Sequence, residues 1–133
     1  MYKFVRIGLP VQAIHDPHIG AMTASLLTDR DVVVGISFSG STKDTVDIIR
    51  LAKESGAYVI CMTNYARSPI VKFADAVLLT ASKENPLQGG ALTSKIAQIH
   101  VLDILFTAVA VKHKEKALVA TEKTAKAVLD KLY

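Results

Sequence analysis

The sequence predicts an α/β fold, a three-layer αβα sandwich on a mainly parallel, doubly wound sheet. Three short apolar runs alternate with helical patterns, and each run is continuously apolar rather than alternating with polar residues. Such runs are typical of strands buried on both faces, as in a parallel sheet. The order of strand, helix, strand, turn and strand is that of a doubly wound sheet. From the length we expect a single domain over residues 1–133.

The predicted sheet lies in the centre of the chain. The helix between its first two strands is followed by Gly56, and glycine is the residue type favoured just past a helix C-terminus. In chain order we expect a strand over residues 32–36, a helix over 43–55, a strand over 58–62, a short helical piece over 70–73 and a strand over 76–80.

The flanking segments are predicted to be mainly helical. Val11–Ile14 is expected to form a short strand, followed by a helix that begins at Pro17 or His18 and runs to Leu27. Two further helices are expected over about residues 91–112 and 114–132. From Ile99 onward the first of these is apolar nearly all round, which the surface of a small domain does not tolerate. We therefore expect a homodimer or homotetramer that buries this helix.

Composition and charge argue against several classes of protein. Cys61 is the one cysteine, so a disulfide within the chain is excluded, and a cytoplasmic location is compatible with this. The net charge of +4 suits anionic small molecules, but no basic run longer than a dipeptide indicates nucleic-acid binding. The apolar stretch 99–111 measures about 20 Å as a helix, which is short for a bilayer, and His100 and Asp103 interrupt it. We predict neither a secretory signal nor a membrane span.

The strongest functional pattern is the serine-rich loop that directly follows the predicted strand 32–36. Short side chains around a glycine let backbone N–H groups converge on a phosphate, and the N-terminus of the next helix adds about half a positive charge. An ordinary helix cap needs one hydroxyl, whereas this loop offers four within six residues. We therefore predict phosphate binding by Ser37, Ser39, Gly40, Ser41 and Thr42.

A second loop, residues 81–90, follows the third predicted strand. Loops at the carboxyl ends of parallel strands are where open α/β sheets bind ligands. Glu84 is a candidate to bond to a sugar hydroxyl or take a proton, and Lys83 to hold an anion, although a solvated loop explains these charges equally well. Asn64 and Arg67 follow the second strand and are similarly placed.

No metal or cofactor site is predicted. The histidines are scattered, and His15 and His18 fit a polar loop and a helix start better than a metal site. The phosphate-loop and dinucleotide-binding glycine motifs do not occur.

A family resemblance is carried by residues 36–45, 56–57 and 60–64, with further matches at 3–8, 68–70, Asp75 and 95–103. Together these segments, which span essentially the whole chain, resemble the sugar isomerase (SIS) domain, and most closely the C-terminal sensor domain of RpiR-type transcriptional regulators. The resemblance implies that the serine-rich loop holds the phosphate of a phosphosugar, and that a helix-turn-helix domain elsewhere in such regulators binds DNA.

The chain also departs from that pattern at its start. SIS domains usually open with a strand and a Gly-x-Gly-x-Ser loop, whereas Met1 falls inside the helix that follows them. We expect the first strand, one ligand-binding serine and the DNA-binding domain to be absent, through a fragment or through adaptation by oligomerisation. DNA binding is then expected only through that absent domain.

Three functions remain open at this point. The first is a non-catalytic phosphosugar sensor. The second is an aldose–ketose phosphate isomerase, for which Glu84 is the candidate base and His100 or His18 of a neighbouring subunit a further candidate. The third is a degenerate domain that serves only for oligomerisation.

Overall fold

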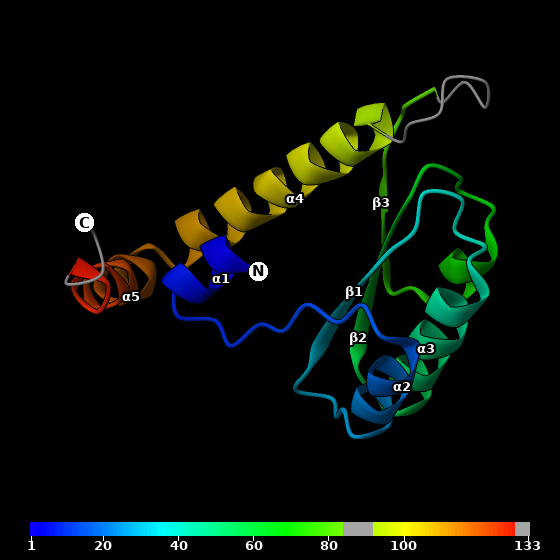
Figure 1. The fold of residues 1–133 in the computed structure, drawn as a ribbon, viewed down its shortest axis with the longest axis horizontal. Helices are drawn as coiled ribbons and strands as arrows, with labels where there is room; N and C mark the ends of the chain where they lie inside the picture. The colour runs from blue at the N-terminus through cyan, green and yellow to red at the C-terminus, as the bar shows by residue number, and fades with distance from the viewer. Residues whose placement is uncertain (84–91, 130–133) are drawn as a thin grey trace. The chain divides into compact units, whose positions relative to one another are not determined.

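The computed structural model describes residues 1–83 and 92–129, and the chain divides into two compact units. One unit is Ile14–Val101, and the other combines Met1–Ala13 with Leu102–Tyr133. Figure 1 labels the α-helices and the strands of both units. In chain order these are α1 (Tyr2–Arg6), α2 (Pro17–Ser25), β1 (Val32–Ile36), α3 (Lys43–Glu54), β2 (Tyr58–Thr63), the 3-10 helix η1 (Pro69–Phe73), β3 (Ala76–Leu79), α4 (Leu92–Lys112) and α5 (Lys114–Lys126).

The unit Ile14–Val101 contains a parallel three-stranded sheet in the order β1-β2-β3. Gly35 lies opposite Cys61, and Cys61 lies opposite Val77. The α/β class and the parallel sheet predicted from the sequence are therefore confirmed. Since the strands run in one direction, their carboxyl ends meet at one edge of the sheet, where open α/β sheets bind ligands.

Helices α3 and α2 pack on each other, and α3 packs against the sheet (Figure 1). Helix α2 begins where expected because the Asp16 carboxylate accepts a hydrogen bond from the Ile19 N–H at 2.9 Å and Pro17 is its first residue. Helix α3 ends before Gly56, whose φ of +99° is the left-handed conformation expected there.

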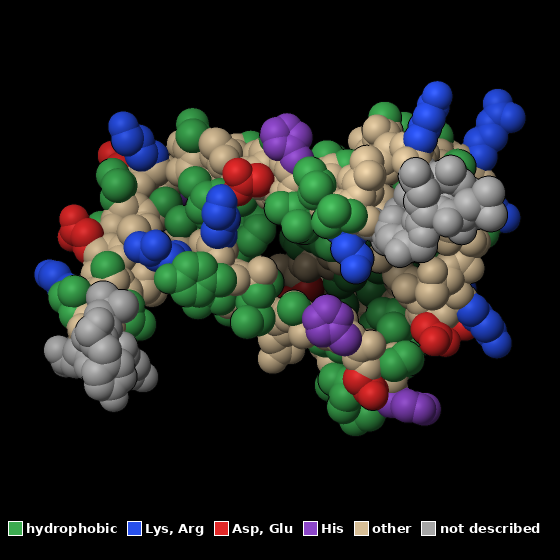
Figure 2. Space-filling view, turned by 45° about the horizontal axis from the view of Figure 1, so that its top comes forward, with side chains coloured by type: hydrophobic (Ala, Val, Ile, Leu, Met, Phe, Trp, Pro, Cys, Tyr) green, Lys and Arg blue, Asp and Glu red, His purple; other side chains and the backbone are tan. Residues whose placement is uncertain are grey.

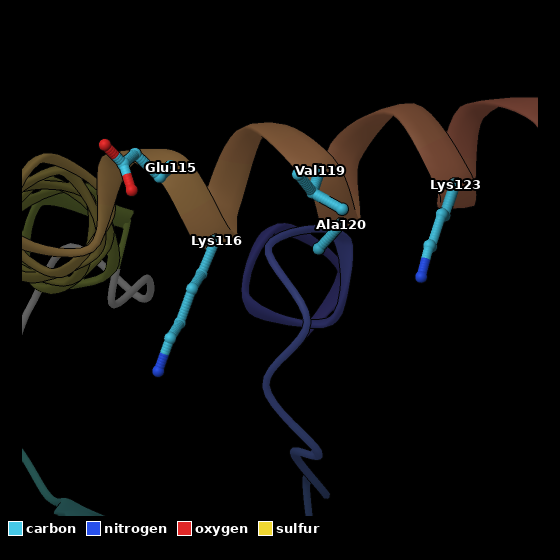
Figure 3. A pocket seen from close by; sticks show the side chains of 5 residues that line it. All are labelled: Glu115, Lys116, Val119, Ala120 and Lys123. Carbon is cyan, nitrogen blue, oxygen red and sulfur yellow. The ribbon is translucent and has the colours of Figure 1, made fainter.

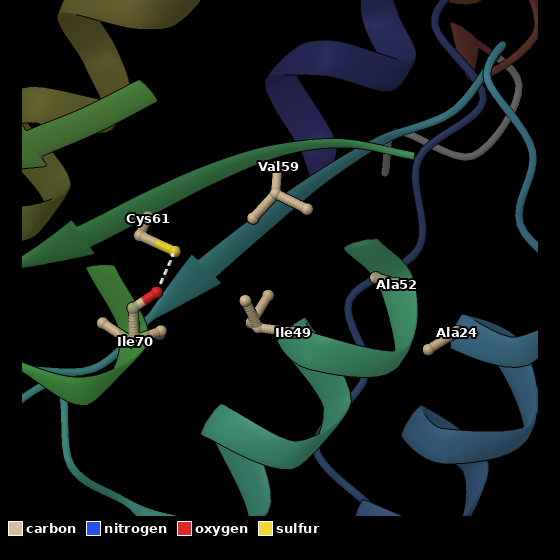
Figure 4. Close-up of a cluster of buried hydrophobic side chains, with 6 residues drawn as sticks. All are labelled: Ala24, Ile49, Ala52, Val59, Cys61 and Ile70. Atoms are coloured by element: carbon tan, nitrogen blue, oxygen red, sulfur yellow. Dashed lines mark hydrogen bonds between the residues drawn. The ribbon is translucent and has the colours of Figure 1, made fainter. Parts of the chain in front are cut away.

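The core of this unit lies between the sheet and these helices. Figure 4 shows side chains from α2, α3, β2 and η1 converging, with Ile49 between β2 and α2. Gly35 of β1 permits this packing, because a Cβ there would lie 2.6 Å from the Ile49 Cδ1 atom. The buried cluster consists of Ala24, Ile49, Ala52, Val59, Cys61 and Ile70.

The Cys61 thiol is buried in this core and donates a hydrogen bond to the Ile70 carbonyl at 3.4 Å (Figure 4). Burial, with a smaller contribution from the negative charge of Asp75, raises the pKa of this thiol to about 11. The thiolate is the reactive form, and at pH 8 only about one molecule in a thousand carries it. We expect a chromogenic disulfide reagent to modify Cys61 only in denaturant, and rapid modification of the native protein would contradict the buried position.

Asp75, just before β3, connects that segment to helix α3 and to strand β2. Its carboxylate accepts hydrogen bonds from the Lys53 ammonium group and from the Val59 N–H, the latter at 2.8 Å. The bond from Lys53 first, and then the bond from Val59, lower the pKa of Asp75 below its ordinary value of 3.8.

A lowered folded-state pKa makes Asp75 a source of acid sensitivity. Its stabilising contribution is complete above the unfolded-state pKa and is lost as the pH falls through the lower folded-state pKa. We expect Asp75→Asn to lower the melting temperature at pH 7 and to have a shrinking effect below about pH 4. Melting curves from pH 7 down to pH 2.5 test this, and Lys53→Met should reproduce part of the change. An effect of Asp75→Asn that is independent of pH would contradict the role given to its charge.

The second unit is held by contacts between helices α1 and α5 and the C-terminal part of α4. The Phe4 ring meets the edge of Phe106 with centroids 5.5 Å apart, and Lys3 pairs with Asp103. The Thr124 hydroxyl donates to the Arg6 carbonyl at 3.3 Å.

Three boundary predictions are corrected by the structure. Val11–Ile14 is not a strand, because no described strand pairs with its backbone. Helix α2 ends at Ser25 rather than Leu27, and α5 ends at Lys126. The predicted final helical residues 130–132 lie outside the described residues.

Helix α4 exposes many of the apolar side chains that the sequence predicts to be covered. Ile96, Ile99 and Ile104 are all more than half exposed. Figure 2 shows hydrophobic side chains open to solvent on the face in view. By length and composition α4 is able to cross a membrane, but a single helix of this kind is weak evidence for a span. Its burial in an oligomer stays a prediction.

Candidate functional site

The serine-rich loop, residues 37–42, joins the carboxyl end of β1 to the start of α3. Residues 64–68 follow β2, and residues 80–83 follow β3. The parallel sheet thus brings these three segments to one edge. The predicted phosphate-binding residues, together with Asn64, Arg67 and Lys83, lie in these segments, whereas His18 lies on α2 and His100 on α4.

Ser37 forms the inner layer of the serine-rich loop. It is buried, with 6 % of its surface exposed, and its N–H donates to the Met62 carbonyl at 3.0 Å. Its hydroxyl oxygen accepts from the Gly40 N–H at 3.1 Å and lies 3.2 Å from the Thr42 hydroxyl oxygen. Ser37 is therefore engaged in shaping the loop.

Gly40 is required by both conformation and space. Its φ of +62° is left-handed, and a Cβ at this position would lie 2.1 Å from the Ser68 Oγ and 2.5 Å from the Ser68 Cβ. Ser68 is itself buried, and its hydroxyl donates to the Tyr65 carbonyl at 2.8 Å. A side chain at residue 40 would therefore displace the turn that follows β2.

Ser39, Ser41 and Thr42 form the outer layer, and all three are exposed. The Ser39 hydroxyl accepts hydrogen bonds from the Ser41 N–H at 3.2 Å and from the Ser41 hydroxyl at 3.0 Å. Thr42 is the N-cap of α3, yet within the described residues its side chain makes no capping bond. An ordinary side-chain cap therefore does not account for the hydroxyls, and the first-turn N–H groups of α3 face the same exposed loop.

The loop is fixed from behind by residues at the end of β2. The buried Thr63 hydroxyl and the Asn64 N–H both donate to the Phe38 carbonyl, each at 3.0 Å. The Phe38 ring also meets the edge of Tyr65, with centroids 5.7 Å apart. Sequence reasoning did not identify Thr63 or Ser68 as supports, because their contacts join segments about 25 residues apart.

The remaining candidate residues are either exposed to solvent or outside the described part of the chain. Lys83 and Arg67 are exposed, and so are His18 and His100. Glu84 lies outside the described residues. Among residues 1–83 and 92–129, no three His, Cys, Asp or Glu side chains gather as a metal ion would require.

A shallow hollow of about 350 Å³ lies on α5 and is separate from the serine-rich loop in the chain. Figure 3 shows its lining, with the lysine side chains extending from one side of the helix. Its residues are Glu115, Lys116, Val119, Ala120 and Lys123. None of them belongs to the candidate site.

Several proteins are similar to this chain in sequence. A helix-turn-helix transcriptional regulator from Caldanaerobacter subterraneus is 46% identical over 112 residues, which are 84% of this chain and 40% of that protein. The regulator RpiR of Escherichia coli is 42% identical over 123 residues, which are 92% of this chain and 42% of RpiR. The chain thus spans less than half the length of these relatives.

Solved structures share the fold. NanR of Vibrio vulnificus, complexed with ManNAc-6P, superposes with a TM-score of 0.90 at 30% identity and covers 98% of this chain and 49% of NanR. The sugar isomerase domain of an RpiR transcription factor from Sphaerobacter thermophilus gives a TM-score of 0.76 at 22% identity, covering 94% of this chain and 68% of that one. A family model for the SIS domain matches residues 1–108, so the chain belongs to the SIS domain family, and its relatives are RpiR-type regulators.

Proposed function

We propose that this chain is a phosphosugar-binding, non-catalytic sensor domain of an RpiR-type transcriptional regulator. The observation that carries the proposal is the serine-rich loop, where three exposed hydroxyls surround a helix N-terminus that lacks a side-chain cap. The similarity to helix-turn-helix regulators and to NanR, which was solved with ManNAc-6P, supports this function.

In this proposal the loop binds the phosphate group of the ligand. The hydroxyls of Ser39, Ser41 and Thr42 donate to phosphate oxygens, and the first-turn N–H groups of α3 add donors and a favourable dipole. Ser37 and Gly40 keep the loop in shape from the buried side. The exposed Lys43, the first residue of α3, adds positive charge close to the bound anion.

The remaining parts of the function follow from the same family. DNA binding would require a helix-turn-helix domain outside these 133 residues, and the ligand would act on it through the arrangement of subunits. We propose a homodimer or homotetramer, in which the exposed apolar face of α4 is covered, and a cytoplasmic location.

A thermal-shift screen over hexose, pentose and amino-sugar phosphates tests the proposal. A ligand present at a hundred times its dissociation constant stabilises the folded state by about 2.7 kcal/mol, so a clear rise in melting temperature is expected for at least one compound. Ser39→Ala combined with Thr42→Ala should abolish that rise. Ser55→Ala, at the opposite end of α3, is the matched control and should keep it.

Two results would contradict the proposal. A wild-type protein that no sugar phosphate stabilises has no sensor function of this kind. A sugar phosphate that is converted to its isomer, with the conversion lost in Glu84→Ala, would replace the sensor by an isomerase.

A further inference from the structure

Asn64 is the first residue after β2 and lies between two loops of the candidate site. Its backbone N–H donates to the Phe38 carbonyl of the serine-rich loop at 3.0 Å. Its side chain points toward the β3 side of the sheet edge and bonds to Thr80 and Ser82. One half-buried residue thus connects the segment after β1 with the segment after β3.

The side chain of Asn64 continues the pairing of β2 with β3 beyond the end of the strands. The last backbone bond between them runs from the Thr80 N–H to the Thr63 carbonyl at 3.0 Å. Two residues on, the Asn64 Oδ1 accepts from the Ser82 N–H at 2.9 Å, and the Asn64 Nδ2 donates to the Ser82 carbonyl at 3.1 Å. The side-chain amide therefore bonds both backbone groups of one residue.

Only an amide of this length meets these requirements. Aspartate retains the acceptor but has no N–H to offer the Ser82 carbonyl, and glutamine places its amide one methylene farther out. The hydroxyls of Thr80 and Ser82 also point to the Asn64 Oδ1, each at 3.4 Å. Loss of the side chain would leave these groups without their common partner.

We infer that Asn64 is a positioning residue that aligns the segment 80–83 with the serine-rich loop, and so sets how the non-phosphate part of the ligand is recognised. This consequence for the ligand rests on the proposed function. In the proposed function the serine-rich loop binds the phosphate, and the segment after β3 lies at the same carboxyl edge of the sheet, where the rest of the ligand would be recognised. Asn64 contributes to binding without contacting the ligand.

Amide hydrogen exchange tests the alignment in the absence of any ligand. In the wild type we expect the Ser82 N–H to be protected, as is the Thr80 N–H, which bonds to a backbone carbonyl and serves as the internal control. Asn64→Ala should speed exchange at Ser82 by about tenfold or more and leave Thr80 little changed. Asn64→Asp keeps the acceptor and should retain most of the protection. Unprotected Ser82 in the wild type, or equal protection in Asn64→Ala, would overturn the inference.

Two anionic probes separate alignment from phosphate binding. Asn64→Ala should bind inorganic phosphate as the wild type does but bind N-acetylmannosamine 6-phosphate, or whichever sugar phosphate the screen identifies, about tenfold more weakly. Ser55→Ala, at the end of α3 far from the serine-rich loop, is the matched control and should bind both probes as the wild type does. An equal loss for both probes would assign Asn64 to the phosphate site instead. If the wild type binds neither probe, the proposed function fails, while the exchange measurement still decides the inference.

Discussion

Gly40→Ala is expected to abolish stabilisation by sugar phosphates and to lower the free energy of unfolding by about 3 kcal/mol. A non-glycine residue in the left-handed conformation costs roughly 1–2 kcal/mol, and forcing a methyl group into filled space costs about 1–3 kcal/mol more. The space is filled by Ser68, whose Cβ lies 2.5 Å from the position of the new atom. The substitution therefore distorts the phosphate loop and the turn behind it together.

A matched control is provided by Gly56, which follows α3. Its φ of +99° is also left-handed, but the nearest atom to an added Cβ is the Asp29 nitrogen at 3.6 Å, an ordinary contact. Gly56→Ala should therefore show the conformational cost alone and keep the response to ligand. Urea unfolding and the thermal-shift assay measure both variants. If Gly40→Ala is no less stable than Gly56→Ala and still responds to ligand, the tight packing at Gly40 is wrong.

Ile49→Ala is expected to destabilise the protein by about 2–5 kcal/mol, the cost of removing a large side chain from a packed core. Ile49 is 1% exposed and lies at the centre of the cluster that joins α3 to the sheet. Urea unfolding measures the change. Leu51→Ala on the same helix is the comparison, because Leu51 is only partly buried and should cost less.

A double variant tests why β1 contains a glycine. Gly35→Ala alone should also destabilise, because its Cβ would lie 2.6 Å from the Ile49 Cδ1 and 2.7 Å from the Ile49 Cγ1. When Ile49→Ala removes both atoms, the added methyl group enters the vacated space. The double variant should therefore be more stable than the sum of the single changes predicts, by about 1 kcal/mol or more. Simple additivity would show that Gly35 and Ile49 do not share this space.

The central elements were predictable because their signals are local. The apolar runs of β1, β2 and β3, and the glycine after α3, lie within the segments that they define. Val11–Ile14 was predicted wrongly for the opposite reason, since a strand depends on a neighbour that supplies hydrogen bonds. An apolar run alone does not show whether such a neighbour exists.

The position of the candidate site was predictable from the sequence, but the separate structural roles of its residues were not. Four hydroxyls look equivalent in the sequence, yet Ser37 is buried while Ser39, Ser41 and Thr42 are exposed. That difference arises from the Met62 carbonyl and the loop's own turn, which no local pattern encodes. Asn64 was placed near the site, but its bonds to Ser82 depend on the register of β2 and β3.

The hydrogen bonds within the serine-rich loop have a thermodynamic consequence for signalling. Ser37 holds Gly40, and Ser39 holds Ser41, through hydrogen bonds that the loop makes within itself. A preorganised loop loses less conformational entropy on binding than a loop that must first be ordered, so the ordering cost reduces its affinity less. A loop with the same shape in the free and bound protein does not itself shift the regulator between states. A ligand shifts a regulator between states only through contacts that differ between those states. In the proposed function, the serine-rich loop would then supply affinity for the phosphate. The difference between active and inactive states would arise from contacts between the sugar and other parts of the oligomer.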